Sequence, residues 1–171
     1  MACTLLTGGV TIACSPNVGG IKKAYITDFV NVENGFTEAS GVISAVAIDS
    51  GENYYEFEFN KNTSFYTESE ANSIENGTNF KTQVITLVIP RREVAKRNVI
   101  RLLAQKRLSI IVKDQNGLNW VLGMTNGMDL TTNEGGSGTA KADMNGYTLT
   151  LTGEEPEMAS TVSDAILATL L

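Results

Sequence analysis

Carboxylates are the side chains that could do acid–base chemistry here, because the chain of 171 residues contains no histidine. The lack of histidine removes Ser-His-Asp and Cys-His sites and the commonest general base at neutral pH. The carboxylates worth testing are Asp114, Asp129 and Asp143, beside expected turns, and a run of Glu154, Glu155 and Glu157. Turn capping and a solvated corner explain all of them. The sequence therefore predicts a protein that is not an enzyme.

Two cysteines, Cys3 and Cys14, offer thiol chemistry or a metal ligand. Neither has a second cysteine or a histidine at metal-ligand spacing, so we expect no metal and no cofactor. The two could form a disulfide across a short hairpin, or remain thiols, and a reducing cytoplasm favours thiols. The longest apolar run, residues 84–89, is too short to span a bilayer, and no secretory signal is expected. Synthesis in a cytoplasm is the resulting expectation.

Positive charge is concentrated in one segment, residues 91–107. Seven of the 13 lysines and arginines lie there against one acid, so it carries +6, and the other residues carry −12 because the whole chain is −6. Apolar residues recur in it at steps of three and four, which predicts an amphipathic helix beginning after Pro90. The basic face could be simply solvated, could contact DNA phosphates, or could pair with acids of a neighbouring subunit. A pI near 4.7 and the lack of interleaved aromatic residues weigh against DNA.

The rest of the chain alternates with a period of two, which is typical of strands. We expect strands at residues 25–32, 41–48, 54–60, 64–70, 79–89, 108–113, 118–124 and 147–152. A projecting hairpin or loop is expected near residues 60–78, where turn residues gather. The sequence therefore predicts one domain over residues 1–171, mainly β, an antiparallel β-sandwich or barrel with one amphipathic helix at about 91–107.

Two features near the end of the chain complete this outline. Asn145-Gly146 predicts a turn with positive φ, after which Tyr147, Leu149 and Leu151 share a buried face opposite three threonines. Residues 160–171 are apolar with one charge and end on Leu170 and Leu171. This segment either completes the chain's own sheet or forms a C-terminal arm that lies on an adjacent copy as an added strand.

These late segments also carry a family resemblance. The pattern comprises residues 119–123, residues 128–132, a glycine-rich turn over 135–138, and the strand from Asn145 to the acidic corner at Glu154-Glu155. Over roughly residues 80–171 it resembles the phage tail-tube-like structural proteins. The resemblance implies a virion protein whose copies form a sixfold ring in the tail channel, together with other tail or portal-proximal proteins. Genomic DNA would pass through that channel without specific binding, and no membrane would be involved.

The resemblance also assigns places to the segments. It implies an outward-lying helix, a loop at 60–78 that contacts the next ring, and an inter-subunit arm at 160–171. The location implied is the virion tail, with the host cytoplasm during assembly. Two rival interpretations remain open: a capsid decoration or fibre-attachment β-sandwich protein, and a carbohydrate-binding module. Combining charge, tail and resemblance, the candidate subunit-interface residues are Arg91, Arg92, Lys96, Arg97, Arg101, Glu154, Glu155, Glu157, Ile166, Leu167, Leu170 and Leu171.

Overall fold

Two stacked β-sheets and two helices make up the fold in the computed structural model, which describes residues 8–12 and 14–171. The larger sheet has seven strands in the order β2-β3-β11-β8-β7-β1-β4. Its strands are β1 (Ile21–Asp28), β2 (Phe36–Ala39), β3 (Val42–Val46), β4 (Tyr55–Phe57), β7 (Leu108–Asp114), β8 (Asn119–Leu122) and β11 (Ser160–Val162). A short 3-10 helix, η1 (Phe29–Asn31), follows β1.

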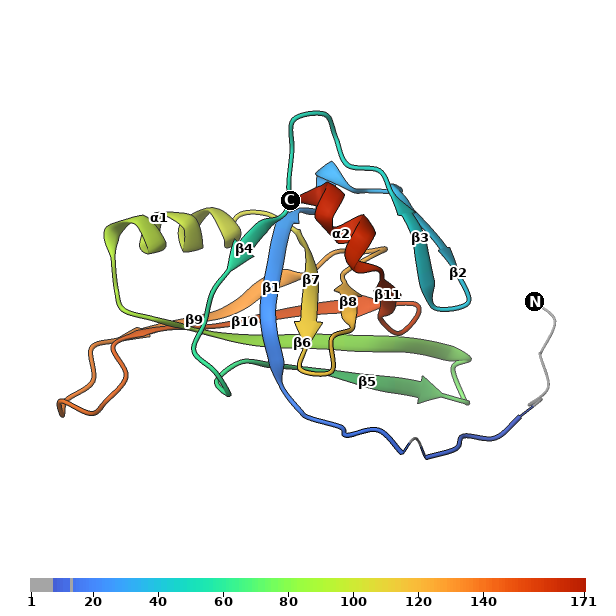
Figure 1. Cartoon of the computed structure of the whole chain (residues 1–171), viewed down its shortest axis with the longest axis horizontal. Helices are drawn as coiled ribbons and strands as arrows, with labels where there is room; N and C mark the ends of the chain where they lie inside the picture. The colour runs from blue at the N-terminus through green and yellow to red at the C-terminus, as the bar shows by residue number, and fades with distance from the viewer. Residues whose placement is uncertain (1–7, 13) are drawn as a thin grey trace.

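The smaller sheet has four strands in the order β5-β6-β10-β9, and every neighbouring pair is antiparallel. Its strands are β5 (Phe65–Ser73), β6 (Thr78–Pro90), β9 (Asp129–Gly136) and β10 (Gly146–Glu155). In Figure 1 these strands run across those of the larger sheet, as in sandwiches whose sheets pack crosswise. The predicted β-rich sandwich is confirmed, and the alternative of a closed barrel is wrong.

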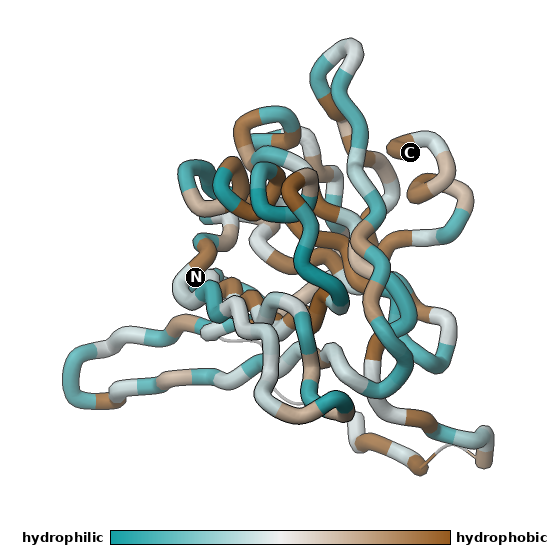
Figure 2. Tube along the Cα trace, turned by 90° about the vertical axis from the view of Figure 1, so that its left-hand side faces the viewer, coloured by the Kyte–Doolittle hydropathy of each residue, from teal (hydrophilic) through white to brown (hydrophobic). Residues whose placement is uncertain are grey.

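The main core fills the space between the two sheets. It is built from alternate, inward-facing residues, of which Ile85, Leu87, Leu149, Leu151 and Ile110 are fully buried. The predicted buried face of Tyr147, Leu149 and Leu151 is thereby confirmed. In Figure 2 the hydrophobic stretches gather in the body of the molecule, whereas the hairpins that extend from it are mainly hydrophilic. Burial of this alternating pattern is the force that fixes the register of both sheets.

A second core lies on the opposite face of the seven-stranded sheet. Helix α2 (Asp164–Leu170) covers that face and inserts Leu167 and Leu170 against Tyr25, Ile111 and Val121. Because the sheet is buried on both sides, β7 is apolar at consecutive positions instead of alternating. The sequence predicted only one α-helix, whereas the described residues form two, α1 and α2.

The C-terminal segment is consequently not an arm, which corrects a sequence-based prediction. Residues 160–162 form β11 between β8 and β3, and residues 164–170 form α2. Leu167 and Leu170 are only 4% and 2% exposed, so they contact their own chain instead of a neighbour, whereas Ile166 is half-buried and Leu171 is exposed. Of the two possibilities that the sequence left open, the chain's own sheet is the one observed.

The first helix is shorter than predicted. Helix α1 spans Val94–Leu103, because β6 continues through Pro90 and Arg91 then adopts a φ of +63° that no helix contains. Gly146 likewise differs from expectation, since it starts β10 opposite Pro90 and is not among the residues with positive φ. A glycine is needed there for close approach, because a Cβ atom would lie 2.4 Å from the carbonyl oxygen of Ile89.

Residues 60–78 are more regular than a loop. After a short turn at residues 60–63, residues 65–73 pair with residues 78–86 throughout, and only residues 74–77 form the turn of the hairpin. The far half of this hairpin is exposed, and Ile74 at its turn is almost fully so. The segment is therefore an exposed β-hairpin built from β5 and β6.

Candidate interaction surfaces

The outward face of the four-stranded sheet is rich in threonine, and we call it the threonine face. Its apolar members are Phe65, Phe80, Val84 and Val88. The register and the alternation of burial place on it one residue in two from each strand. Its polar members are Thr67, Ser69, Thr82, Thr86, Asp129, Thr132, Glu134, Thr148, Thr150, Thr152 and Glu154. Among these described strands, no lysine or arginine belongs to that face, since Lys81 points inward to Glu70. The surface is thus hydroxyl-rich and weakly acidic.

The threonine face is bordered by two long, unpaired edges. Strands β5 and β9 contain nine and eight residues and have one described partner each, β6 and β10. The larger sheet instead ends in β4 and β2, of only three and four residues. The β2–β3 register shifts once, as the β9–β10 register also does opposite Thr150 and Leu151. Short edges limit further pairing, whereas long edges invite it. The two long edges are therefore the places where another strand can be added.

The direction of the edge strands allows copies to join side by side. Because each neighbour in β5-β6-β10-β9 is antiparallel, β5 and β9 run in opposite directions. If the β9 edge of one copy meets the β5 edge of the next, the pairing remains antiparallel. Their outward residues also avoid like charges, since the acids Asp129 and Glu134 of β9 would meet a β5 edge whose outward residues are all uncharged. Such head-to-tail contacts close into rings when the rotation allows.

Helix α1 and the residues before it bring the predicted basic residues together only in part. Arg91 pairs with Glu93 at 2.8 Å, and Arg92 lies over the ring of Tyr147 at 5.5 Å. The Nζ atom of Lys96 donates to the carbonyl oxygen of Pro90 at 2.7 Å, which ties the helix to β6. Arg97 and Arg101 are exposed, and neither forms an ion pair within the part of the chain that the structure describes.

The acidic residues Glu154, Glu155 and Glu157 also differ in their environments. Glu155 is 3% exposed, and its carboxylate accepts hydrogen bonds from the backbone N–H groups of Thr125 and Asn126 at 3.0 and 2.9 Å. It holds the turn between β8 and β9, which corrects its assignment to a subunit interface, because its carboxylate oxygens are already used within the chain. Glu154 and Glu157 are exposed and remain available to a partner.

Two of the three candidate catalytic aspartates cap turns, as the sequence indicates. Asp114 accepts from the N–H of Leu118 at 2.8 Å, and Asp143 accepts from the N–H groups of Thr139 and Ala140. These backbone donors lower the pKa of the Asp143 carboxyl, because they stabilise its charged form. Within residues 8–12 and 14–171, no group of three or more His, Cys, Asp or Glu side chains could hold a metal ion.

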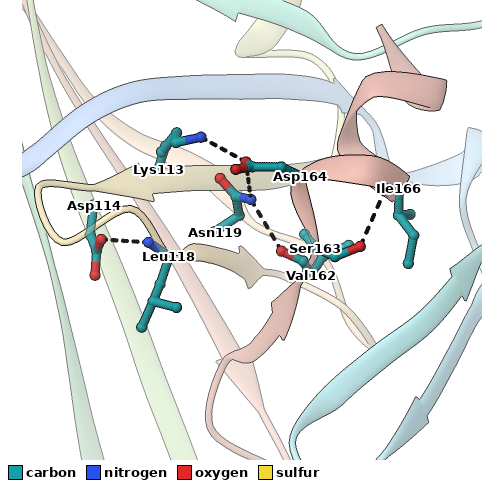
Figure 3. Close-up of polar contacts among 8 residues, drawn as sticks. All are labelled: Lys113, Asp114, Leu118, Asn119, Val162, Ser163, Asp164 and Ile166. Atoms are coloured by element: carbon teal, nitrogen blue, oxygen red, sulfur yellow. Dashed lines mark hydrogen bonds and ion pairs between the residues drawn. The ribbon is translucent and has the colours of Figure 1, made fainter.

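A polar cluster fixes helix α2 to the end of the β7–β8 hairpin (Figure 3). The Nζ atom of Lys113 and the Nδ2 atom of Asn119 both donate to Asp164 Oδ1, at 2.6 and 2.9 Å. These contacts, the Asn119 hydrogen bond first, lower the pKa of the Asp164 carboxyl. Asn119 also donates to the carbonyl oxygen of Val162, and Ser163 caps the helix by accepting from the N–H of Ile166. The cluster anchors α2, and no local pattern of residues indicates it, because Lys113, Asn119 and Asp164 are far apart in the chain.

A groove opens between α1 and β4 and has a volume of about 950 Å³. Its floor is apolar and includes Phe57, Phe59 and Ile89, and Val99 and Leu102 line the side formed by α1. Both helix residues remain substantially exposed, at 43% and 52%. Helix α1 therefore buries only part of its apolar face.

No family model, curated protein or solved structure matches this chain. In the part of the chain that the structure describes, no helix has the length and apolar character needed to cross a bilayer.

Proposed function

We propose that this chain is a structural subunit of a ring in the tail channel of a tailed bacteriophage. The observation that carries the proposal is the four-stranded sheet with two long free edges of opposite direction. Joining β9 of each copy to β5 of the next extends this sheet around a closed barrel, and the sixfold symmetry follows the family resemblance stated above. Such a protein acts through shape and charge, together with other tail or portal-proximal proteins.

The threonine face becomes the channel wall in this arrangement. Larger-sheet elements, including α2, then lie outside the barrel, because they are stacked on the opposite face of the four-stranded sheet. The wall would carry hydroxyl groups and the acids Asp129, Glu134 and Glu154, with no basic side chain from these strands. Phosphates are repelled by like charge and find no lysine or arginine to bind. DNA could therefore slide through without being held.

A proline at the free edge of β9 tests the ring. The Oγ1 atom of Thr131 donates to the carbonyl oxygen of Thr150, so this carbonyl points toward β9. Thr150 pairs with Thr132, and by alternation the N–H of Asn133 points to the free edge. Asn133→Pro removes this donor without breaking the pairing to β10, whereas Asn133→Ala keeps it.

We expect the wild-type protein and Asn133→Ala to form rings or tubes in negative-stain images at high concentration, and Asn133→Pro to stay a folded monomer. Circular dichroism and thermal melting confirm that the proline variant is folded. Monomers or trimers of the wild-type protein under every salt condition would refute the ring and favour a decoration or fibre-attachment protein. Rings of Asn133→Pro equal to wild type would refute the edge contact.

The basic helix offers a second contact between copies. Arg97 and Arg101 are exposed and unpaired within the described chain, and Glu157, which follows β10 and is not part of the channel wall, is an exposed acid. We propose that these groups meet across the subunit boundary, where charge complementarity sets orientation and association rate. Replacing both arginines by glutamate should weaken assembly more at low salt than at high salt. Unchanged assembly would leave α1 as a solvated face.

A further inference from the structure

Residues 8–12 and 14–20, which precede β1, belong to no helix or strand, and all of them are exposed. Val10 and Ile12 are fully exposed, and a Cβ atom added at Gly8, Gly9 or Gly19 would meet nothing within 4 Å. The attachment of this segment lies close to β1, where the N–H of Val18 donates to Asn116 Oδ1 and Asn116 donates to Asn17. Exposed β-branched residues that alternate with polar or small ones are typical of a strand that packs one face on another surface.

The groove between α1 and β4 provides such a surface, since it has an apolar floor that nothing in the described chain covers. Its walls carry both signs of charge, with Glu56 and Glu58 on the β4 side and Lys96 and Lys106 on the α1 side. Lys106 is already paired with Asp28. A charged peptide of either sign would therefore meet like charge on one wall. Residues 8–20 contain no charged residue, so this segment fits a groove of mixed sign.

Within one molecule, the groove and residues 8–20 lie at opposite ends of β1. Residues 8–20 leave β1 at its Ile21 end, whereas the groove is lined by the other end of β1, from Ile26 to Asp28. In Figure 1 the segment (dark blue) runs away from α1 and β4. The geometry therefore indicates a groove on a second copy.

We propose that residues 8–12 of one copy lie in the α1–β4 groove of another, with Val10 and Ile12 on its apolar floor. Side chains hold the contact more than backbone pairing does, because β4 offers an edge of only three residues. Thr11, between the two apolar residues, faces away from the floor. The contact requires only two copies, so it does not depend on the ring proposed above.

Disulfide trapping tests the contact directly. In a chain with Cys3→Ser and Cys14→Ser, one preparation carries Val10→Cys and a second carries Val99→Cys, on the groove wall. The matched control replaces Val99→Cys with Ala168→Cys, because Ala168 is exposed on α2, outside the groove. Under mild oxidation we expect the mixed Val10–Val99 dimer to form several-fold more than the control dimer. Equal trapping of both pairs would overturn the proposal.

A second pair of variants separates the two faces of the segment. Val10→Asn with Ile12→Asn should weaken self-association in analytical ultracentrifugation, whereas Thr11→Asn should leave it unchanged. The thermal midpoint of both should equal that of the wild-type protein, since the segment contacts little of its own chain. Self-association of the double variant at wild-type strength would overturn the proposal. Formation of the Val10–Val99 disulfide without rings would refute only the ring. Rings without this disulfide would refute only the groove contact.

Discussion

Leu170 tests whether the C-terminal segment belongs to the chain's own core. Leu170→Ala deletes a side chain that is 2% exposed and packed in the second core, whereas Leu171→Ala trims one that is 52% exposed. Truncation of a buried leucine costs about 2–5 kcal/mol, through lost burial and the cavity left behind. A surface truncation of the same chemistry stays within about 0.5 kcal/mol. The two substitutions are adjacent and chemically identical, so only the environment differs.

Thermal and urea denaturation measure this difference. For a domain of this size, about 1 kcal/mol moves the thermal midpoint by roughly 2–4 °C, so Leu170→Ala should lower it by roughly 5–15 °C. Leu171→Ala should lower it by less than about 2 °C. Because α2 packs on the seven-stranded sheet through Leu167 as well, Leu167→Ala should behave like Leu170→Ala.

Equal and small shifts for Leu170→Ala and Leu171→Ala would refute the packing of α2. The segment would then be free to act as the inter-subunit arm that the sequence allowed, and the ring would have to be rebuilt around it. A large shift in Leu170→Ala alone assigns the segment to the fold. Removing residues 160–171 should in that case unfold the chain instead of giving a folded monomer.

Three further predictions test other parts of the structure. Glu155→Gln should destabilise the protein by about 1–3 kcal/mol in urea denaturation, because one carboxylate oxygen that accepts from Thr125 or Asn126 becomes a donor. Asp164 has a lowered pKa in the folded state, so its contribution is present above the unfolded carboxyl pKa of about 4 and is lost as pH falls through the folded value. The difference in urea midpoint between wild type and Asp164→Asn should therefore shrink in acid, and a constant difference would contradict the ion pair. Gly146→Ala should cost about 1–3 kcal/mol by thermal melting, because its methyl group would lie 2.4 Å from the Ile89 carbonyl oxygen, and a neutral effect would contradict that approach.

Much of the fold could be predicted because one face of most strands is buried. The alternation that places Tyr147, Leu149 and Leu151 on one side is visible in the sequence and survives in the structure. The turn between β7 and β8 was also predicted from its residues, and the carboxylate of Asp114 caps it. Where pattern and packing agree, local sequence was sufficient.

The prediction failed where tertiary contacts decide the outcome. The position of residues 164–170 depends on the open face of the seven-stranded sheet, on which Leu167 and Leu170 pack. Glu155 was assigned to the surface because its neighbours Glu154 and Glu157 are charged, yet the turn at residues 125–126 lies over it. Gly146 was assigned to a turn from its Asn-Gly pair, although the close passage of β6 explains it. None of these partners is near in sequence.

The correction at the C-terminus strengthens the case for edge-to-edge assembly. If residues 160–171 were an inter-subunit arm, that arm would join the copies of the ring, and no contact between sheet edges would be needed. With α2 packed on its own sheet, the long contacts left open are the edges of β5 and β9 and the groove beside β4. Natural proteins rarely leave two edges of nine and eight residues uncovered, because such long edges promote uncontrolled pairing. Pairing of β9 in one copy with β5 in the next would cover both edges and so prevent uncontrolled pairing.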